Sequence, residues 1–138
     1  MLTNTGTKPA RISAQRIKPI TSRLDPYLKL YIYDANTKQC IYPKPKPPKT
    51  KKPKKGQRPL WPKPSGVCKA TGDWSKMPKS FVLQPKRVGK YLVKGAAAAR
   101  WIPKEKHQIQ IRWEISASAP NNLENQLSGY TLRWRAMR

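Results

Sequence analysis

Acidic residues are scarce in this sequence. Six Asp and Glu stand against 30 Lys and Arg in 138 residues, so the formal net charge is +24. The six acids are spread so thinly that no two lie within four residues of each other. Catalysis by paired carboxylates, or a carboxylate-rich metal site, would therefore need groups from distant parts of the chain. We expect neither.

Metal-binding and catalytic motifs are also missing. The chain has two cysteines, Cys40 and Cys68, and one histidine, His107, whereas a structural zinc site usually needs four such ligands in close pairs. A Cys40–Cys68 disulfide is possible, but nothing in the sequence indicates secretion, so we expect reduced thiols. His107 alternates with isoleucines, which favours a strand-end residue over a catalytic base. Neither a GxxxxGKS/T phosphate loop nor a GxSxG element occurs, and we expect no cofactor and no enzymatic activity.

Long apolar runs are absent as well. No run approaches the roughly 20 residues that a membrane-spanning helix needs, so we expect no membrane insertion. The first 24 residues contain no acid and several Lys and Arg, a composition that resembles an organellar transit peptide. Pro9 and Pro19 would interrupt the amphipathic helix of such a peptide. We interpret residues 1–24 as a basic N-terminal arm, with an organellar address as the alternative.

The most distinctive segment runs from Pro43 to Pro64. Seventeen of its 22 residues are Lys, Arg or Pro, and none is acidic. Proline prevents a helix or a central strand, and the lysines repel one another, so we expect an extended, partly polyproline II segment. Such a segment is suited to binding a polyanionic partner. The alternative interpretation is a solvated linker with no binding role.

Alternating apolar and polar residues predict strands on either side of this segment. Within residues 25–42, Leu28, Leu30 and Ile32 fall on one face and a turn at 34–37 leads to a returning strand, which predicts a β-hairpin. We expect 43–80 to be a Lys/Pro-rich extended region and 81–138 to be a β-rich body that packs with the hairpin. The clearest strands there are 107–116 and 130–137. The predicted fold class is all-β, a small antiparallel sheet, sandwich- or barrel-like, with long basic arms.

One face of these strands should form the core. The residues expected there are Leu28, Leu30, Ile32, Phe81, Leu83, Leu92, Ile109, Ile111, Trp113, Ile115, Leu132 and Trp134. We expect Trp101 to anchor its loop onto this core, whereas Trp61 and Trp74 fit a loop anchor or base stacking equally well.

Two groups of basic residues are candidates for nucleic-acid binding. The first lies in the Lys/Pro-rich segment: Lys44, Lys46, Lys49, Lys51, Lys52, Lys54, Lys55, Arg58, Trp61 and Lys63. Lysine acts as a mobile point charge, so this group should contact the backbone without reading sequence. The second group depends on strands 107–116 and 130–137 pairing with each other. That pairing would place Arg112, Arg133 and Arg135 on one sheet surface. The alternative to a binding surface is an ordinary solvated face of the sheet.

The composition is similar to that of small basic proteins of ribosomes and other ribonucleoprotein particles. We expect a non-enzymatic structural protein that binds RNA, or alternatively DNA, together with neighbouring proteins of a larger assembly. One alternative is a cement or linker protein of a virion or other particle that binds acidic protein surfaces. Another is an accessory subunit that pairs with a partner by strand addition. The expected location is the cytoplasm or such a particle, with no small-molecule substrate.

Overall fold

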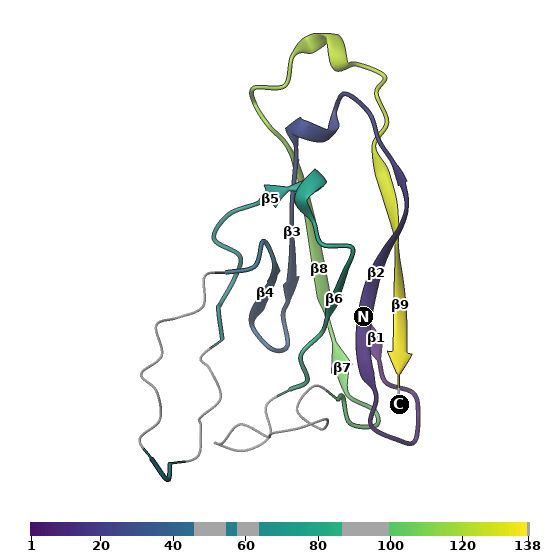
Figure 1. Cartoon of the computed structure of the whole chain (residues 1–138), viewed down its shortest axis with the longest axis vertical. Coiled ribbons are helices and arrows are strands. Elements are labelled where there is room, and N and C mark those ends of the chain that lie inside the picture. The colour runs from purple at the N-terminus through teal and green to yellow at the C-terminus, as the bar shows by residue number, and fades with distance from the viewer. Residues whose placement is uncertain (46–54, 58–63, 87–99, 138) are drawn as a thin grey trace.

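The computed structural model describes residues 1–45, 55–57, 64–86 and 100–137 (Figure 1). Its strands are β1 (Leu2–Thr3), β2 (Arg11–Ile20), β3 (Leu28–Asp34), β4 (Gln39–Tyr42), β5 (Gly72–Asp73), β6 (Ser80–Val82), β7 (Lys106–His107), β8 (Ile109–Ile115) and β9 (Gly129–Met137). Single 3-10 turns occur at η1 (Asp25–Tyr27), η2 (Trp74–Lys76) and η4 (Asn121–Leu123). In the described residues these strands pair antiparallel, so the prediction of a mainly β protein with small antiparallel sheets is confirmed.

The first sheet has the order β6-β2-β9, with β2 in the centre. Residues 11–20 are therefore a strand and not part of an arm, and the expectation of an N-terminal arm over 1–24 is wrong for this stretch. The reason lies in a period-two pattern, since the buried Ile12 and Ala14 alternate with Arg11, Ser13 and Gln15. The pairing shifts register between Ile17 and Ile20, where Lys18 has a φ of 49°.

The second sheet is built around β3. Lys29 of β3 pairs with Asp73 of β5 on one side and with Glu114 of β8 on the other. β8 therefore lies along one edge of β3, and β4 and β5 lie along the opposite edge. The hairpin predicted at 25–42 is confirmed as β3 and β4, with Ile32 opposite Tyr42. β1 and β7 form a separate two-stranded pair. In the described residues the sheets do not close into a barrel.

The strands predicted at 107–116 and 130–137 both exist, but they do not pair with each other. β8 pairs with β3 along its whole length, and β9 pairs with β2. The two strands have the same alternation, which determines a face but not a partner. Because residues 11–20 also form a strand, β9 could pair with either β8 or β2, and it pairs with β2.

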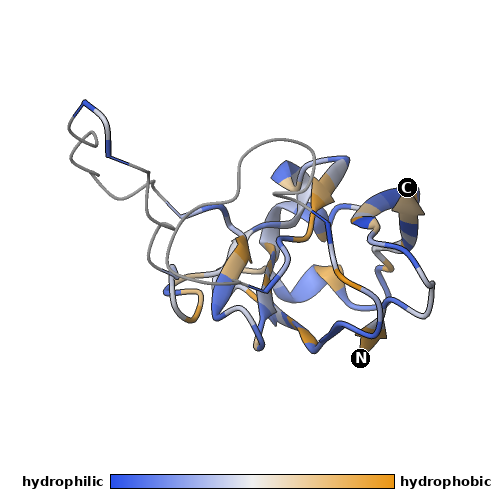
Figure 2. Cartoon of the chain, turned by 90° about the horizontal axis from the view of Figure 1, so that it is seen from below, coloured by the Kyte–Doolittle hydropathy of each residue, from blue (hydrophilic) through white to orange (hydrophobic). Residues whose placement is uncertain are grey.

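The core lies between the two sheets. One cluster joins Leu28, Leu30 and Ile32 to Tyr42, Trp74 and Met77, and the other joins Ala10, Ile12, Leu83 and Trp101. Phe81 packs against both clusters. Figure 2 shows apolar residues interleaved with hydrophilic ones along the ribbons, as expected for sheets that cover a core on one face.

Three of the expected core residues are exposed. Ile111, Trp113 and Ile115 keep 41%, 44% and 63% of their surface accessible. They are on the same face as the buried Leu28, Leu30 and Ile32, but β8 is at the edge of its sheet, where the opposite layer covers less. Leu92 lies outside the described residues. Trp74 and Trp101 are buried instead, so for both residues the loop-anchor interpretation is the correct one.

Cys40 and Cys68 form a disulfide, so the expectation of reduced thiols is wrong. Their Cα atoms lie 4.8 Å apart because the chain after Pro64 returns beside β4. There the Gly66 N–H donates to the Lys38 carbonyl, and the Cys40 N–H donates to the Ser65 hydroxyl oxygen. The bond joins the two flanks of the Lys/Pro-rich segment.

Within the region 43–80, the described residues after Pro64 are more regular than predicted. Its later part contains β5, η2 and the first residue of β6, and it places Trp74 and Met77 in the core. The sequence breakers that suggested an irregular chain, such as Thr71-Gly72-Asp73, form short elements here.

Candidate nucleic-acid interface

The outer face of β2 and β9 carries three exposed arginines. Cross-strand partners share a face of a sheet, and the register places Arg11 opposite Met137, Ser13 opposite Arg135, and Gln15 opposite Arg133. The other face of β2 holds the buried Ile12 and Ala14. We call the outer surface the Arg face and define it as Arg11, Ser13, Gln15, Thr131, Arg133 and Arg135.

This sheet contains no negative charge. β2, β6 and β9 have five Arg and Lys among their residues and no Asp or Glu. In the part of the chain that the structure describes, no salt bridge involves Arg11, Arg133 or Arg135. Arginine stays protonated in proteins and presents a planar fork that matches phosphate oxygens. The Arg face is thus a positive surface without a counter-charge of its own.

The packing below the Arg face holds it rigid. Ala14 is fully buried, and Trp134 meets Phe81 edge-to-face with 6.4 Å between ring centroids. The Leu83 N–H extends the sheet by donating to the Ile12 carbonyl at 2.9 Å. Side chains that start from a central strand and its long partner are better positioned than those on a loop.

The few acids of the chain lie elsewhere, and five of the six have partners. Asp25 bonds Ser22 and Ser128, Asp34 and Glu105 bond His107, Asp73 bonds Lys29 and Lys76, and Glu114 bonds Arg112. The hydrogen bonds from Lys29 and Lys76 hold the pKa of Asp73 at about 2. The negative charges are therefore used within other parts of the molecule.

The residues predicted from the sequence fall into three groups. Arg133 and Arg135 lie on the Arg face, whereas Arg112 lies on β8 of the other sheet, where it pairs with Glu114 at 3.0 Å. The expectation of one surface with all three arginines is wrong, because their strands do not pair. Lys44 and Lys55 are exposed. The remaining candidates, Lys46, Lys49, Lys51, Lys52, Lys54, Arg58, Trp61 and Lys63, lie outside the described residues.

Arg11 and Gln15 were missed by the sequence analysis. The alternation of Arg11, Ser13 and Gln15 with Ile12 and Ala14 is a strand signal of the same kind as in β9. The sequence analysis instead interpreted residues 1–24 as an arm because they contain no acid and several Lys and Arg. Pro9 precedes β2, and Pro19 lies at its end, beyond the register shift.

His107 is the centre of a buried charged cluster. Its Nδ1 lies 2.6 Å from Asp34 Oδ2, and its Nε2 lies 2.8 Å from Glu105 Oε1. The ring is fully buried and stacks on Trp101 with 3.8 Å between centroids. Burial by itself would lower the pKa of His107, but the hydrogen bonds to Asp34 and Glu105 outweigh it and raise the pKa. Burial likewise opposes ionisation of Asp34, yet the bonds from His107 and Thr37 lower its pKa.

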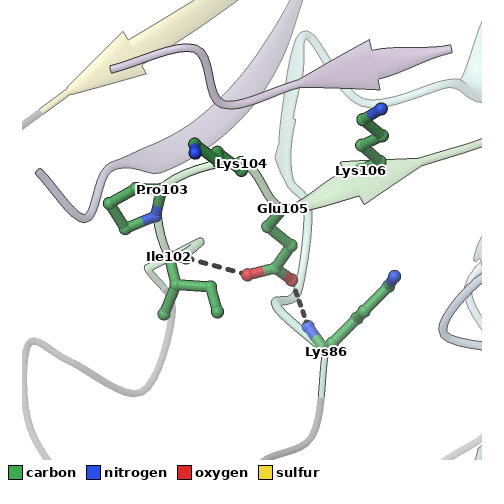
Figure 3. Close-up of a pocket in the computed structure, with 6 residues that line it drawn as sticks. All are labelled: Lys86, Ile102, Pro103, Lys104, Glu105 and Lys106. Carbon is green, nitrogen blue, oxygen red and sulfur yellow. Dashed lines mark hydrogen bonds between the residues drawn. The ribbon is translucent and has the colours of Figure 1, made fainter. Parts of the chain in front are cut away.

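The geometry of this cluster suits a structural role. Both ring nitrogens face a carboxylate, so neither can accept a proton from a substrate. Glu105 is held further by the N–H groups of Lys86 and Ile102, at 2.5 and 2.8 Å (Figure 3). A pocket of about 330 Å³ adjoins it, lined by Lys86, Ile102, Pro103, Lys104, Glu105 and Lys106. With its one carboxylate already saturated, that pocket presents no catalytic pair.

The described residues form neither a metal site nor a membrane-spanning helix. No group of three or more His, Cys, Asp or Glu in the described ranges could hold a metal ion. None of the helices described is long and apolar enough to cross a membrane. Comparison of the chain with protein-family models, with curated proteins and with solved structures finds no match.

Proposed function

We propose that the protein is a non-enzymatic structural component of a nucleoprotein assembly, and that the Arg face binds the phosphate backbone of RNA, or alternatively DNA. The Lys/Pro-rich segment adds contacts through its lysines and Arg58. In this proposal Trp61 stacks on an unpaired base, and neighbouring proteins complete the assembly. The site of action is a ribonucleoprotein particle or a virion.

The observation that carries the proposal is the acid-free sheet beneath the Arg face. A chain of charge +24 attracts polyanions in general, but that charge alone does not define a surface. The register of β2 and β9 brings Arg11, Arg133 and Arg135 onto one face. Ser13, Gln15 and Thr131 lie beside them and supply neutral hydrogen-bonding groups of the kind that also contact phosphate and sugar.

Replacing the three arginines of the Arg face with glutamine tests this proposal. Anisotropy titrations with labelled single-stranded RNA and duplex DNA would be run over a range of salt concentrations. Each lost phosphate contact reduces the salt slope by about 0.7 for single strands and about 0.9 for duplex. We therefore expect the slope of log K against log salt to become shallower by about 2 on RNA and about 3 on duplex DNA.

A matched control removes the same charge elsewhere. Lys38, Lys69 and Lys106 are exposed and lie off the Arg face, so changing them to glutamine lowers the net charge equally. The control should lose clearly less affinity. Equal losses in the two triple variants would show that total charge matters and that the Arg face does not. Arginine-to-lysine changes add a third arm, because they keep the charge and remove the planar fork.

The lysine-rich segment can be tested separately from the Arg face. Glutamine at Lys49, Lys51, Lys52, Lys54 and Lys55 removes five charges and none of the described contacts. If six phosphates are engaged by this segment, the parent slope on duplex includes a contribution of about −5 from it. If this variant binds nucleic acid with the same affinity and salt slope as the parent protein, the contacts with nucleic acid come from the Arg face alone.

A second candidate function is a cement protein of a virion or other particle, with acidic protein surfaces as partners. The Cys40–Cys68 disulfide favours it, because disulfides persist mainly outside the reducing cytoplasm. Nuclease treatment separates the two functions. A partner that stays bound after complete digestion of nucleic acid would favour the cement role.

A further inference from the structure

The exposed edge of β8 is the second unusual surface of the molecule. β8 has seven residues, and in the described part of the chain β3 is its one pairing partner. Ile111, Trp113 and Ile115 are well exposed along it. A long edge strand with exposed apolar side chains tends to pair with another strand unless it is covered or blocked.

The backbone of β8 has its hydrogen-bonding groups oriented for such a pairing. In an antiparallel ladder, alternate residues point their N–H and C=O groups to opposite edges. The Ser116 N–H donates to the Tyr27 carbonyl, and the Gln108 carbonyl accepts from the Ala35 N–H. Even-numbered residues therefore face β3, and the backbone groups of Ile111 and Ile115 point to the other edge.

Strand pairing already occurs on that other edge, just before β8. β1 pairs with β7, and the Asn4 N–H donates to the Glu105 carbonyl at 3.0 Å. The odd-numbered Glu105 faces β1, as the alternation requires. The β1–β7 pairing reaches toward β8 only as far as Leu2 opposite His107, so in the described residues no strand pairs with this edge at 109–115.

The sequence of this edge is complementary to itself. Residues 111–115 read Ile-Arg-Trp-Glu-Ile. A second copy paired antiparallel about Trp113 places Ile111 opposite Ile115 and Arg112 opposite Glu114, twice by symmetry. A register centred on Arg112 would instead oppose two arginines, and one centred on Glu114 would oppose two glutamates. Like charges directly opposite are unfavourable, so charge disfavours these two registers, and the register centred on Trp113 is the one that places Arg112 opposite Glu114.

We propose that the protein forms a two-fold symmetric dimer through antiparallel pairing of β8 with β8 of a second copy, in the register centred on Trp113. The inference is independent of nucleic-acid binding. Each Trp113 keeps its present contact with Trp74, at 4.5 Å between ring centroids. The pairing continues the β3-β8 sheet across the dimer and covers Ile111 and Ile115.

The charge around β8 permits this contact despite the positive charge of the whole chain. Arg112 and Glu114 balance each other, and the neighbouring Lys29 is paired with Asp73. Repulsion between two chains of charge +24 acts over a longer range and is screened by salt. Dimerisation should therefore strengthen as salt rises, which is opposite to the salt dependence of phosphate binding.

Sedimentation velocity on nuclease-treated protein tests the proposal. A single strand pair is a small interface, so concentrations up to the order of 100 μM are needed to detect a Kd in the micromolar range or above. We expect a monomer–dimer equilibrium that shifts toward dimer between low and moderate salt.

Charge variants test the register. Arg112→Glu and Glu114→Arg each place like charges opposite one another in both symmetric pairs, and each should weaken the homodimer about tenfold or more. The double variant R112E/E114R keeps the net charge and restores the complementarity, so it should dimerise like the parent. A mixture of the two single variants should form heterodimers. Circular dichroism on every variant would confirm that the fold is unchanged.

Two results would overturn this inference. One is a parent protein that stays monomeric at every salt concentration, which would leave the edge to a different chain. The other is dimerisation that is equally strong in Arg112→Glu, Glu114→Arg and the double variant, which would place the interface elsewhere on the molecule.

Discussion

The two sheets of this protein cover one core but carry charge in different ways. The β6-β2-β9 sheet contains five cations and no acid, and it leaves three arginines exposed on one face. The sheet around β3 contains Asp34, Asp73 and Glu114, each paired with a basic group. With only six acids available, the fold concentrates charge pairing on one side and leaves the other side positive. If the proposed function holds, stability and binding depend mainly on different sheets.

Removal of Asp34 should have the largest effect on stability. Asp34→Ala leaves the fully buried His107 with one carboxylate and removes the acceptor for the Asn36 and Thr37 N–H groups. Breaking a buried charged pair in this way costs about 3–5 kcal/mol. Urea denaturation would measure the loss.

Arg133→Gln is the matched change on the other sheet. Arg133→Gln alters an exposed side chain and should change the free energy of unfolding by no more than about 0.5 kcal/mol. It should still weaken nucleic-acid binding. Similar stability losses in Asp34→Ala and Arg133→Gln would contradict the division between a stabilising sheet and a binding sheet.

Loss of the disulfide should come next in size. The Cys40–Cys68 bond has a sequence separation of 28 residues, and closing a loop of that length stabilises a fold by about 3–4 kcal/mol in the chain-entropy description. The double variant with serine at both positions should unfold at correspondingly lower urea concentration. Its Arg face does not touch the bond, so the salt slope contributed by the Arg face should not change.

The pH dependence of stability should be smaller and should come from the His107 cluster. The pKa of His107 in the folded state is raised above 6.5. Its contribution to the free energy of unfolding is therefore complete below pH 6.5 and is lost as pH rises through the folded-state pKa. The lowered pKa of Asp34 gives a contribution that is present above pH 3.8 and is lost as pH falls through its folded pKa. The unfolding free energy should therefore be greatest between pH 3.8 and 6.5.

Urea titrations from acid to mildly alkaline pH at constant salt would check this profile. A His107→Gln variant should lose the alkaline decline. Stability that rises above pH 6.5 in the parent protein would contradict the assignment.

Local sequence patterns predicted much of the fold. The alternation in 28–34 and the turn at 34–37 predicted the hairpin, and the alternation at 107–116 and 130–137 predicted β8 and β9. Leu28, Leu30, Ile32 and Leu83 are buried as expected. These features depend on neighbouring residues and turn chemistry, which a single sequence displays directly.

Features that depend on distant segments could not be predicted in the same way. Which strand pairs with β9, and whether Cys40 meets Cys68, are decided by how remote segments meet. Trp113 illustrates the limit, since its position on the apolar face was predicted but its exposure follows from β8 being an edge strand. Two of the three arginines of the Arg face were predicted, Arg133 and Arg135, because their segment has a clear strand pattern. Arg11 was not predicted, because it lies in a segment that was interpreted from its basic composition.

The central position of β2 has a consequence for folding during synthesis. Arg11 pairs with Met137, and the rest of β2 pairs with residues down to Gly129. Contacts of such long sequence separation form slowly, because a long loop must close before any pairing energy is gained. A ribosome makes residues 129–137 more than a hundred positions after β2. Until then β2 remains unpaired with β9. The positive face that we propose for phosphate binding is accordingly absent from a nascent chain until β9 has emerged.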